Sequence, residues 1–181
     1  DNERIIRQLP FIDDARIIVV PVSDSEADIV VLTKDVYSLG GSYSYKGLKA
    51  GEVSVFEKNI FGIGHEFGLE IPYNSKKPDS PGFGAYYIAD NIAKSFINLK
   101  VEYRKGLGQE TYGFSLIRKL LSSSTKYSGG ITVQQVYTTV IVDSILRQPL
   151  KYNLQDYWLN RSFLINEESV TRIIIGARYI N

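Results

Sequence analysis

Residues 95–105 alternate apolar and polar side chains, and from position 97 to position 104 the alternation has no break. The apolar positions are Ile97, Leu99, Val101 and Tyr103, and the polar positions between them are Asn98, Lys100, Glu102 and Arg104. A β-strand directs successive side chains to opposite faces, so this segment predicts a strand with one apolar face and one charged face. A half-buried strand of a soluble protein has the same period, so the segment alone does not identify its surroundings.

The same alternation recurs along the chain after position 35, and no segment there has the helical period that would cover a sheet. Nine strands are predicted, at 36–45, 51–58, 65–73, 83–90, 97–104, 110–119, 127–137, 155–163 and 170–180. Repeated two-faced strands of about ten residues are typical of an antiparallel transmembrane β-barrel, with lipid outside and water or polar side chains inside. A soluble β-sandwich with a binding face is the alternative.

Composition excludes several classes of function. The 181 residues include 21 basic and 20 acidic side chains, so neither a nucleic-acid-binding field nor a disordered acidic tract is indicated. The absence of cysteine excludes disulfides and thiolate metal sites, and a single histidine, His65, does not predict a metal centre. We expect no enzyme activity, no metal and no cofactor. The 13 tyrosines and 15 glycines fit a barrel with aromatic girdles and a sandwich equally well.

The alternation assigns side chains to two faces. Outward apolar positions are predicted at Tyr37, Leu39, Tyr43, Tyr45, Phe67, Leu69, Ile71, Tyr73, Tyr112, Phe114, Leu116, Ile173, Ile175, Ala177 and Tyr179. Lumen-facing positions are predicted at Glu66, Glu70, Lys100, Glu102 and Arg104. Paired carboxylates such as Glu66 and Glu70 occur in acid–base catalysis. We favour a lumen role instead, in which they pair with Lys100 or Arg104 of neighbouring strands.

The first 35 residues differ from the rest. Residues 2–9 have a helical pattern that ends before Pro10, and strands are predicted at 15–22 and 28–34. Helix, strand, turn and strand resemble the back half of a small α+β domain. We therefore divide the chain into residues 1–35 and a barrel part at 36–181. Because a single-chain barrel normally has an even number of strands, nine strands predict a piece of a longer protein.

The predicted connections fall into two alternating sets. Longer segments at 46–50, 74–82, 105–109 and 138–154 alternate with compact turns at 59–64, 91–96, 121–126 and 165–169. Outer-membrane barrels have long outer loops and short periplasmic turns. The first set is therefore predicted to lie outside.

Several motifs carry a family resemblance. Residues 3–22, ERIIRQLPFIDDARIIVVPV, are similar to the closing helix and strand of a POTRA domain, and DIVVLTKD at 28–35 to its final strand. Residues 59–64, NIFGIG, look like the Asn-x-aromatic-Gly-x-Gly turn near the start of BamA-type barrels. The segments YGFS at 112–115 and DYWLNRSF at 156–163 resemble later barrel segments. The chain thus resembles the BamA-type (surface-antigen) outer-membrane assembly superfamily.

The resemblance implies a sixteen-stranded barrel in the outer membrane of a Gram-negative bacterium, with periplasmic POTRA domains. Such proteins insert other barrel proteins, and their first barrel strand forms a lateral gate at which a client strand is added by β-augmentation. The gate strand here would include Ser38, Gly40, Gly41, Ser42 and Ser44. The implied partners are unfolded outer-membrane client proteins, periplasmic chaperones, accessory lipoproteins and membrane lipid. A passive channel or secretion pore is the second interpretation.

Overall fold

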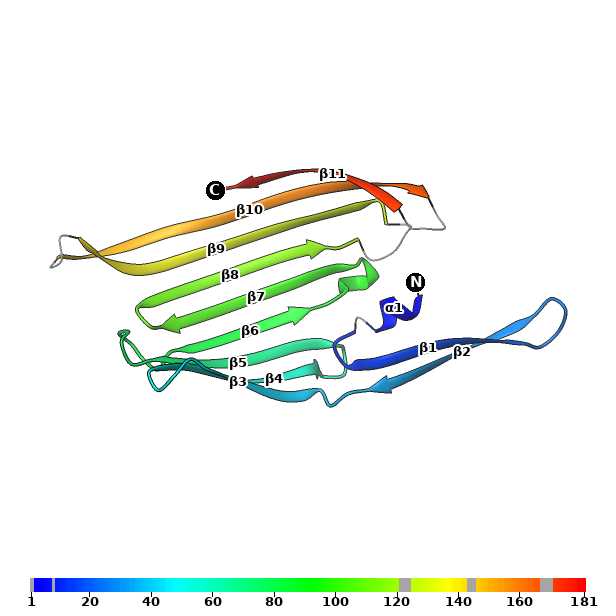
Figure 1. Cartoon of the computed structure of the whole chain (residues 1–181), viewed down its shortest axis with the longest axis horizontal. Helices are drawn as coiled ribbons and strands as arrows, with labels where there is room; N and C mark the ends of the chain where they lie inside the picture. Colours follow the sequence, from blue (N-terminus) through cyan, green and yellow to red (C-terminus); the bar gives the residue numbers. More distant parts are fainter. Residues whose placement is uncertain (1, 8, 121–124, 143–145, 167–170) are drawn as a thin grey trace.

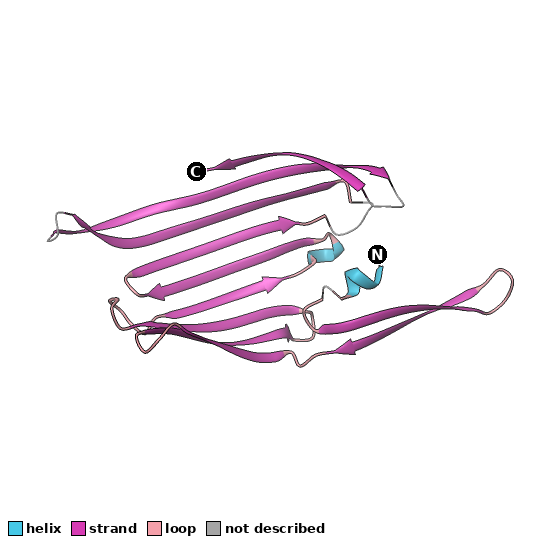
Figure 2. Ribbon diagram, viewed as in Figure 1, coloured by secondary structure: helices cyan, strands magenta, loops and turns pink. Residues whose placement is uncertain are grey.

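The computed structural model describes residues 2–7, 9–120, 125–142, 146–166 and 171–181. Its elements follow the chain in a simple order (Figures 1 and 2). They are α1 Asn2–Ile6, β1 Ile12–Pro21, β2 Ala27–Asp35, β3 Leu39–Tyr45, β4 Ala50–Ile60, β5 His65–Asn74, β6 Phe83–Ala89, the 3-10 turn η1 Ile92–Lys94, β7 Ile97–Gly106, β8 Gln109–Arg118, β9 Tyr127–Val142, β10 Leu146–Asn166 and β11 Thr171–Ile180.

Strands β3 to β11 form one antiparallel sheet in which each strand pairs with its neighbours in sequence, while β1 and β2 form a separate two-stranded sheet. The prediction of a mainly β, antiparallel fold is confirmed, because strands make up 72% of the chain and helix only 4%. In the described residues β3 and β11 each pair on one side only, so the nine strands do not close into a barrel. The residues before β3 contain one short helix and one hairpin, and no POTRA domain is seen.

The predicted loop at 138–154 is wrong. The described residues on either side of 143–145 belong to β9 and β10, and Thr138 pairs with Leu150. The segment contains Pro149, a residue type that normally interrupts a strand. Gln155 exchanges both backbone hydrogen bonds with Asn181 next to β11 (2.7 and 2.9 Å). Odd-numbered residues of β10, including Pro149, therefore direct their nitrogen away from β9, where a missing N–H breaks no β9–β10 bond.

The predicted difference in loop length between the two ends of the sheet is also wrong. We call the end at which α1 lies the near end and the opposite end the far end. At the far end, β7 and β8 are joined by only residues 107 and 108, whereas the connection 75–82 is long. At the near end, the connection 90–96 is almost as long as 75–82. Helix α1 is likewise shorter than predicted, since it ends at Ile6.

The register places the predicted side chains on the two expected faces. Across β5 to β8, Phe67, Tyr87, Val101 and Phe114 stand opposite one another in one row, and Gly68, Tyr86, Glu102 and Gly113 form the next row on the other face. We call these the apolar face and the polar face. Large side chains of the apolar face remain exposed, among them Val53 (55%), Ile71 (51%), Leu159 (64%) and Ile175 (63%). No second layer of the described chain covers them (Figure 1).

Glycines on the polar face lie opposite large side chains of the adjacent strand. Gly40 faces Phe56, Gly68 faces Tyr86, and Gly130 faces Trp158. A Cβ added at Gly40 would lie 2.5 Å from the Phe56 ring, and one added at Gly68 would overlap the Tyr86 ring. Because these glycines have no side chain, the rings of the adjacent strand lie over them. Packing on the polar face is therefore between side chains and glycines of neighbouring strands.

Gly68→Ala should lower the unfolding free energy by about 1–3 kcal/mol, because the added methyl group displaces the Tyr86 ring. Urea unfolding of the two proteins side by side measures this. The matched control is the same change in a Tyr86→Ala background, where no ring occupies the space. An equal loss in both backgrounds would contradict the packing role of the pair.

Candidate functional site: a charged face and a free strand edge

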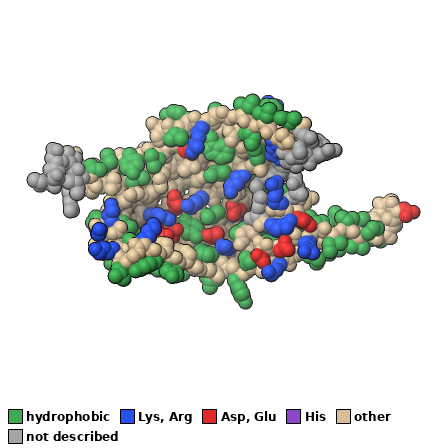
Figure 3. All heavy atoms as spheres, viewed as in Figure 1, with side chains coloured by type: hydrophobic (Ala, Val, Ile, Leu, Met, Phe, Trp, Pro, Cys, Tyr) green, Lys and Arg blue, Asp and Glu red, His purple; other side chains and the backbone are tan. Residues whose placement is uncertain are grey.

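The polar face carries a cluster of ionisable side chains at its centre. All five predicted lumen-facing residues belong to it, together with Tyr86 of β6, and we call the set the charged cluster. It consists of Glu66 and Glu70 on β5, Tyr86 on β6, and Lys100, Glu102 and Arg104 on β7. Figure 3 shows acidic and basic side chains gathered in a hollow across the middle of this face.

One ion pair of the cluster joins two strands that are not neighbours. Arg104 Nη2 lies 2.5 Å from Glu70 Oε2, although β6 runs between their strands. The residue of β6 between them is Gly84, at which a Cβ would lie 3.1 Å from the Glu70 carboxylate and 3.2 Å from Arg104 Cγ. The predicted ion pair between Glu70 and Arg104 is present, whereas the lumen that these residues would face stays a prediction. The ion pair depends on a glycine that sequence reasoning did not connect with it.

The remaining groups of the cluster are paired differently from the prediction. Lys100 Nζ binds Glu102 of its own strand at 2.6 Å and lies 5.9 Å from the centre of the Tyr86 ring. The Tyr86 hydroxyl donates a hydrogen bond of 2.8 Å to Glu66 Oε1. Glu66 and Glu70 therefore have separate partners and do not form a free carboxylate pair. The arrangement suits a hydrated polar wall with nearly balanced charge.

The described residues contain no group of three or more His, Cys, Asp or Glu side chains that could hold a metal ion. His65 forms a hydrogen bond with the Tyr87 hydroxyl, and the two rings meet edge to face at 5.5 Å. His65 is thus part of the packing at the near end of the apolar face.

Strand β3 forms one edge of the sheet, and the direction of its backbone groups can be derived from two hydrogen bonds. The Ser38 carbonyl accepts the Lys58 N–H (2.9 Å), and the Lys46 N–H donates to Ala50 (2.9 Å). In an antiparallel pair such bonding residues alternate along the strand. Even-numbered residues of β3 therefore face β4, and Leu39, Gly41 and Tyr43 direct their N–H and C=O groups to the free edge.

This alternation divides the predicted gate residues by the direction in which their backbone groups point. The backbone groups of Ser38, Gly40, Ser42 and Ser44 belong to the β4 side, and the Ser42 hydroxyl bonds that of Ser54 at 2.8 Å. Of the predicted residues only Gly41 presents its backbone to the free edge. The sequence predicted the strand and its faces. Whether the odd-numbered or the even-numbered residues of β3 bond to β4 leaves no pattern in the sequence, so the backbone groups at the edge could not be predicted.

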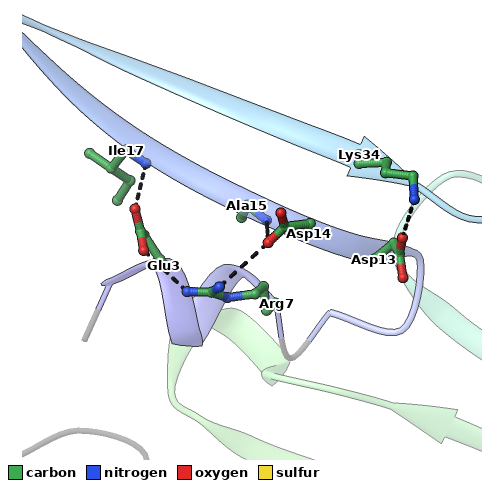
Figure 4. Close-up of polar contacts among 7 residues, drawn as sticks. All are labelled: Glu3, Arg7, Asp13, Asp14, Ala15, Ile17 and Lys34. Atoms are coloured by element: carbon green, nitrogen blue, oxygen red, sulfur yellow. Dashed lines mark hydrogen bonds and ion pairs between the residues drawn. The ribbon is translucent and has the colours of Figure 1, made fainter.

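Helix α1 is anchored to β1 by polar contacts (Figure 4). Glu3 Oε1 accepts the Ile17 N–H at 2.8 Å, and Arg7 bonds Glu3 (3.1 Å) and Asp14 (3.4 Å). Lys34 of β2 binds Asp13 at 2.6 Å, and this contact raises the pKa of Lys34. These contacts tie the helix and the hairpin into one unit.

A cleft of about 420 Å³ separates α1 from the near end of the polar face. Its lining includes Ile5, Leu9 and Phe96 together with Asp90 and Lys119. Burial raises the pKa of the Asp90 carboxyl, Lys119 opposes the increase, and Glu66 adds to it. The near end thus holds a carboxyl group in partly apolar surroundings.

No protein-family model and no curated protein matches this sequence. Among the described residues, no helix has the length and apolar character needed to cross a membrane.

Asp90→Asn should stabilise the fold at neutral pH. The folded chain holds the Asp90 proton more tightly than the unfolded chain, so stability is lost as pH rises from about 3.8 through the raised pKa. The variant avoids this loss, and its advantage should vanish in acid, where the parent is protonated. Unfolding midpoints across this pH range test the assignment. A constant difference at every pH would contradict it.

Proposed function

We propose that β3 to β11 form one wall of an outer-membrane β-barrel that assembles other barrel proteins, in the manner of the BamA-type superfamily. One observation carries the proposal: a nine-stranded sheet presents an uncovered apolar face on one side and a charged face on the other. Hydrocarbon is the environment in which the apolar face needs no protein cover. Further strands extend the wall from the edge of β11, and the last of them pairs only weakly with β3, so that this seam can open to a client strand.

The exposed area of the chain supports a membrane environment. The surface is 12819 Å² for a mass of 20.4 kDa, whereas a compact soluble monomer of this mass exposes about 8,800 Å². The chain thus exposes about 4,000 Å² more surface than a compact soluble monomer of this mass, and large apolar side chains such as Val53, Leu159 and Ile175 are among the exposed residues. A soluble β-sandwich would cover the apolar face with a second sheet, and none is found in the described part of the chain.

The apolar face is bordered by charged and aromatic side chains. Near the far end, Lys105 lies 3.8 Å from Glu110, which also accepts hydrogen bonds from Tyr103 (2.9 Å) and Tyr112 (2.8 Å). Near the other end, Arg118 closes β8. Glu110 and Arg118 are eight steps apart along the strand, which is about 27 Å in length and about 20 Å in height at a tilt of about 40°.

That height is close to the apolar band of about 25 Å that outer-membrane barrels show, and aromatic residues at its borders fit the membrane interfaces. Aromatic side chains also lie near the border at Arg118, on strands β9 and β10. Arg161 lies 5.6 Å from the ring centre of Tyr127 and 4.8 Å from that of Phe163. The spacing therefore supports one crossing of the membrane for each strand.

The free edge of β3 supplies the assembly step. The N–H and C=O groups of Leu39, Gly41 and Tyr43 can add a client strand by β-augmentation, in which backbone bonds give affinity without requiring one client sequence. Inside hydrocarbon an unpaired backbone group costs several kcal/mol, so closing the client barrel provides the driving force. The partners are unfolded outer-membrane proteins, with periplasmic chaperones and accessory lipoproteins delivering them, and no cofactor takes part.

The β1–β2 hairpin fits the closing part of a periplasmic POTRA-like domain. It is apolar on both faces, and its apolar side chains are exposed, among them Val19 (61%), Ile29 (69%) and Leu32 (51%). A two-stranded hairpin is marginal in water without cover. The rest of an α+β domain would supply that cover.

Val101→Arg distinguishes a lipid-facing surface from a water-facing one. Val101 is 44% exposed at the middle of the apolar face. An arginine there should cost about 2–4 kcal/mol in a bilayer, but a comparable surface change in water costs within about 0.5 kcal/mol. Urea unfolding from phosphatidylcholine vesicles measures the difference.

Lys105→Arg, at the border of the apolar face, is the control and should leave the unfolding free energy unchanged. If both variants behave alike, and the parent stays monodisperse in buffer without detergent, the membrane proposal fails.

Tyr43→Pro should block client addition. Proline removes an N–H that points to the free edge, and edge positions tolerate proline, so the β3–β4 pairing survives. Tyr43→Ala keeps the N–H and is the matched control for loss of the ring. Because the chain has no cysteine, a cysteine placed at Ser42 reports client cross-linking without background.

Cross-linking should be lost with Tyr43→Pro and retained with Tyr43→Ala. Equal cross-linking in both variants would contradict β-augmentation at this edge. Absence of cross-links in the parent, with ion conductance intact, would instead favour a passive channel lined by the charged cluster.

A further inference from the structure

Two neighbouring loops at the far end of the sheet carry a group of lysines. Residues 46–49 join β3 to β4, and residues 75–82 join β5 to β6. We call Lys46, Lys49, Lys76 and Lys77 the lysine rim. The only acidic residue of the two loops is Asp79. Figure 3 shows Lys and Arg side chains gathered at this end of the molecule.

Backbone contacts hold the two loops together. The Ser75 N–H donates to the Lys49 carbonyl at 2.8 Å, which fixes one loop against the other. Within the second loop, the Asn74 side chain accepts the Lys76 N–H (3.0 Å), and Ser80 Oγ accepts the Asn74 N–H (2.9 Å). The Leu107 N–H bonds the Asp79 carbonyl at 3.1 Å and ties the loop to the next hairpin. These hydrogen bonds therefore fix the backbone of the two loops that carry the lysines.

The four ammonium groups have no anionic partner within the described part of the chain. All four side chains are exposed, and none takes part in an ion pair there. Lys34, Lys100 and Lys105 differ from the lysine rim, since each has a carboxylate partner. Like charges on two joined loops that form no ion pairs favour binding of an anion with several charged oxygens.

Apolar side chains accompany the lysine rim. Leu48 lies between Lys46 and Lys49 in sequence and is 89% exposed. Tyr45 (65% exposed) and Tyr73 (42%) end the two strands on the apolar face, and both stand beside Gly51 of β4, directly below the loops. Cations, an apolar tip and tyrosines at the border of an apolar face match the layered chemistry of a membrane interface.

We propose that the lysine rim binds the phosphate groups of anionic lipid headgroups at the far-end membrane surface. The inference rests on the proposed membrane location and adds to it a lipid class and a binding surface. Lysine binds phosphate as a point charge, so four amines on two joined loops can neutralise more than one phosphate at once. Leu48 enters the acyl boundary beside the headgroup, and this contact favours a lipid over a soluble phosphate.

The test uses the full chain in neutral detergent micelles, titrated with fluorescently labelled phosphatidylglycerol. Changing Lys46, Lys49, Lys76 and Lys77 to Gln should weaken binding roughly 100- to 1000-fold, from about 1 kcal/mol for each lysine near an anionic surface. The matched control changes Lys34, Lys58, Lys119 and Lys126 to Gln, with the same loss of charge away from the rim. It should bind within about twofold of the parent.

Two further arms identify the source of the phosphate. Inorganic phosphate at the same concentration should not displace the labelled lipid from the parent. Leu48→Ser should weaken binding of the labelled lipid, and inorganic phosphate should compete with the lipid no better in this variant than in the parent. Displacement by inorganic phosphate, or an equal loss in both lysine sets, would overturn the proposal.

The rim variant should still insert into phosphatidylcholine vesicles like the parent. Failure of the parent to insert would refute the membrane location itself, whereas normal insertion with unchanged lipid binding in the rim variant would refute only the lipid site.

Discussion

Backbone pairing between sequential strands is the constraint on which the rest of this structure depends. Each of β4 to β10 bonds to the strand before it and the strand after it, so the register of one pair fixes the faces of the next. Because side chains alternate with a period of two, a slip of one residue would transfer Lys100 and Glu102 to the apolar face. The charged cluster and the exposed apolar surface are thus two consequences of one register.

The polar face keeps that register by contacts that pass sideways between strands. Rings of Phe56, Tyr86 and Trp158 occupy the space above glycines of the adjacent strands. Arg104 reaches Glu70 over Gly84, and this ion pair links three strands. These contacts stabilise a sheet that lacks a second layer in the described part of the chain. They leave the opposite face free for lipid under the proposed function.

Much of this arrangement could be predicted from the sequence, because alternation reports the face of each residue directly. The approximate positions of most strands after residue 35, and the shared face of Glu66, Glu70, Lys100, Glu102 and Arg104, followed from it. The β1–β2 hairpin followed instead from two apolar runs separated by a polar turn. Pairing details could not be predicted in this way, since they depend on which residues stand opposite one another. The role of Gly84, the free backbone groups of Leu39, Gly41 and Tyr43, and the continuation of β10 through Pro149 required the register.

The most direct test of the account is a nitroxide scan along β7 in phosphatidylcholine vesicles, with one introduced cysteine at each position from Ile97 to Arg104. The account predicts that oxygen, which concentrates in hydrocarbon, reaches Leu99 and Val101 best. A water-soluble nickel chelate should instead reach Lys100 and Glu102 best, so that the two signals alternate in opposite phase. High chelate access and low oxygen access at Leu99 and Val101 would contradict the assignment of the apolar face to lipid.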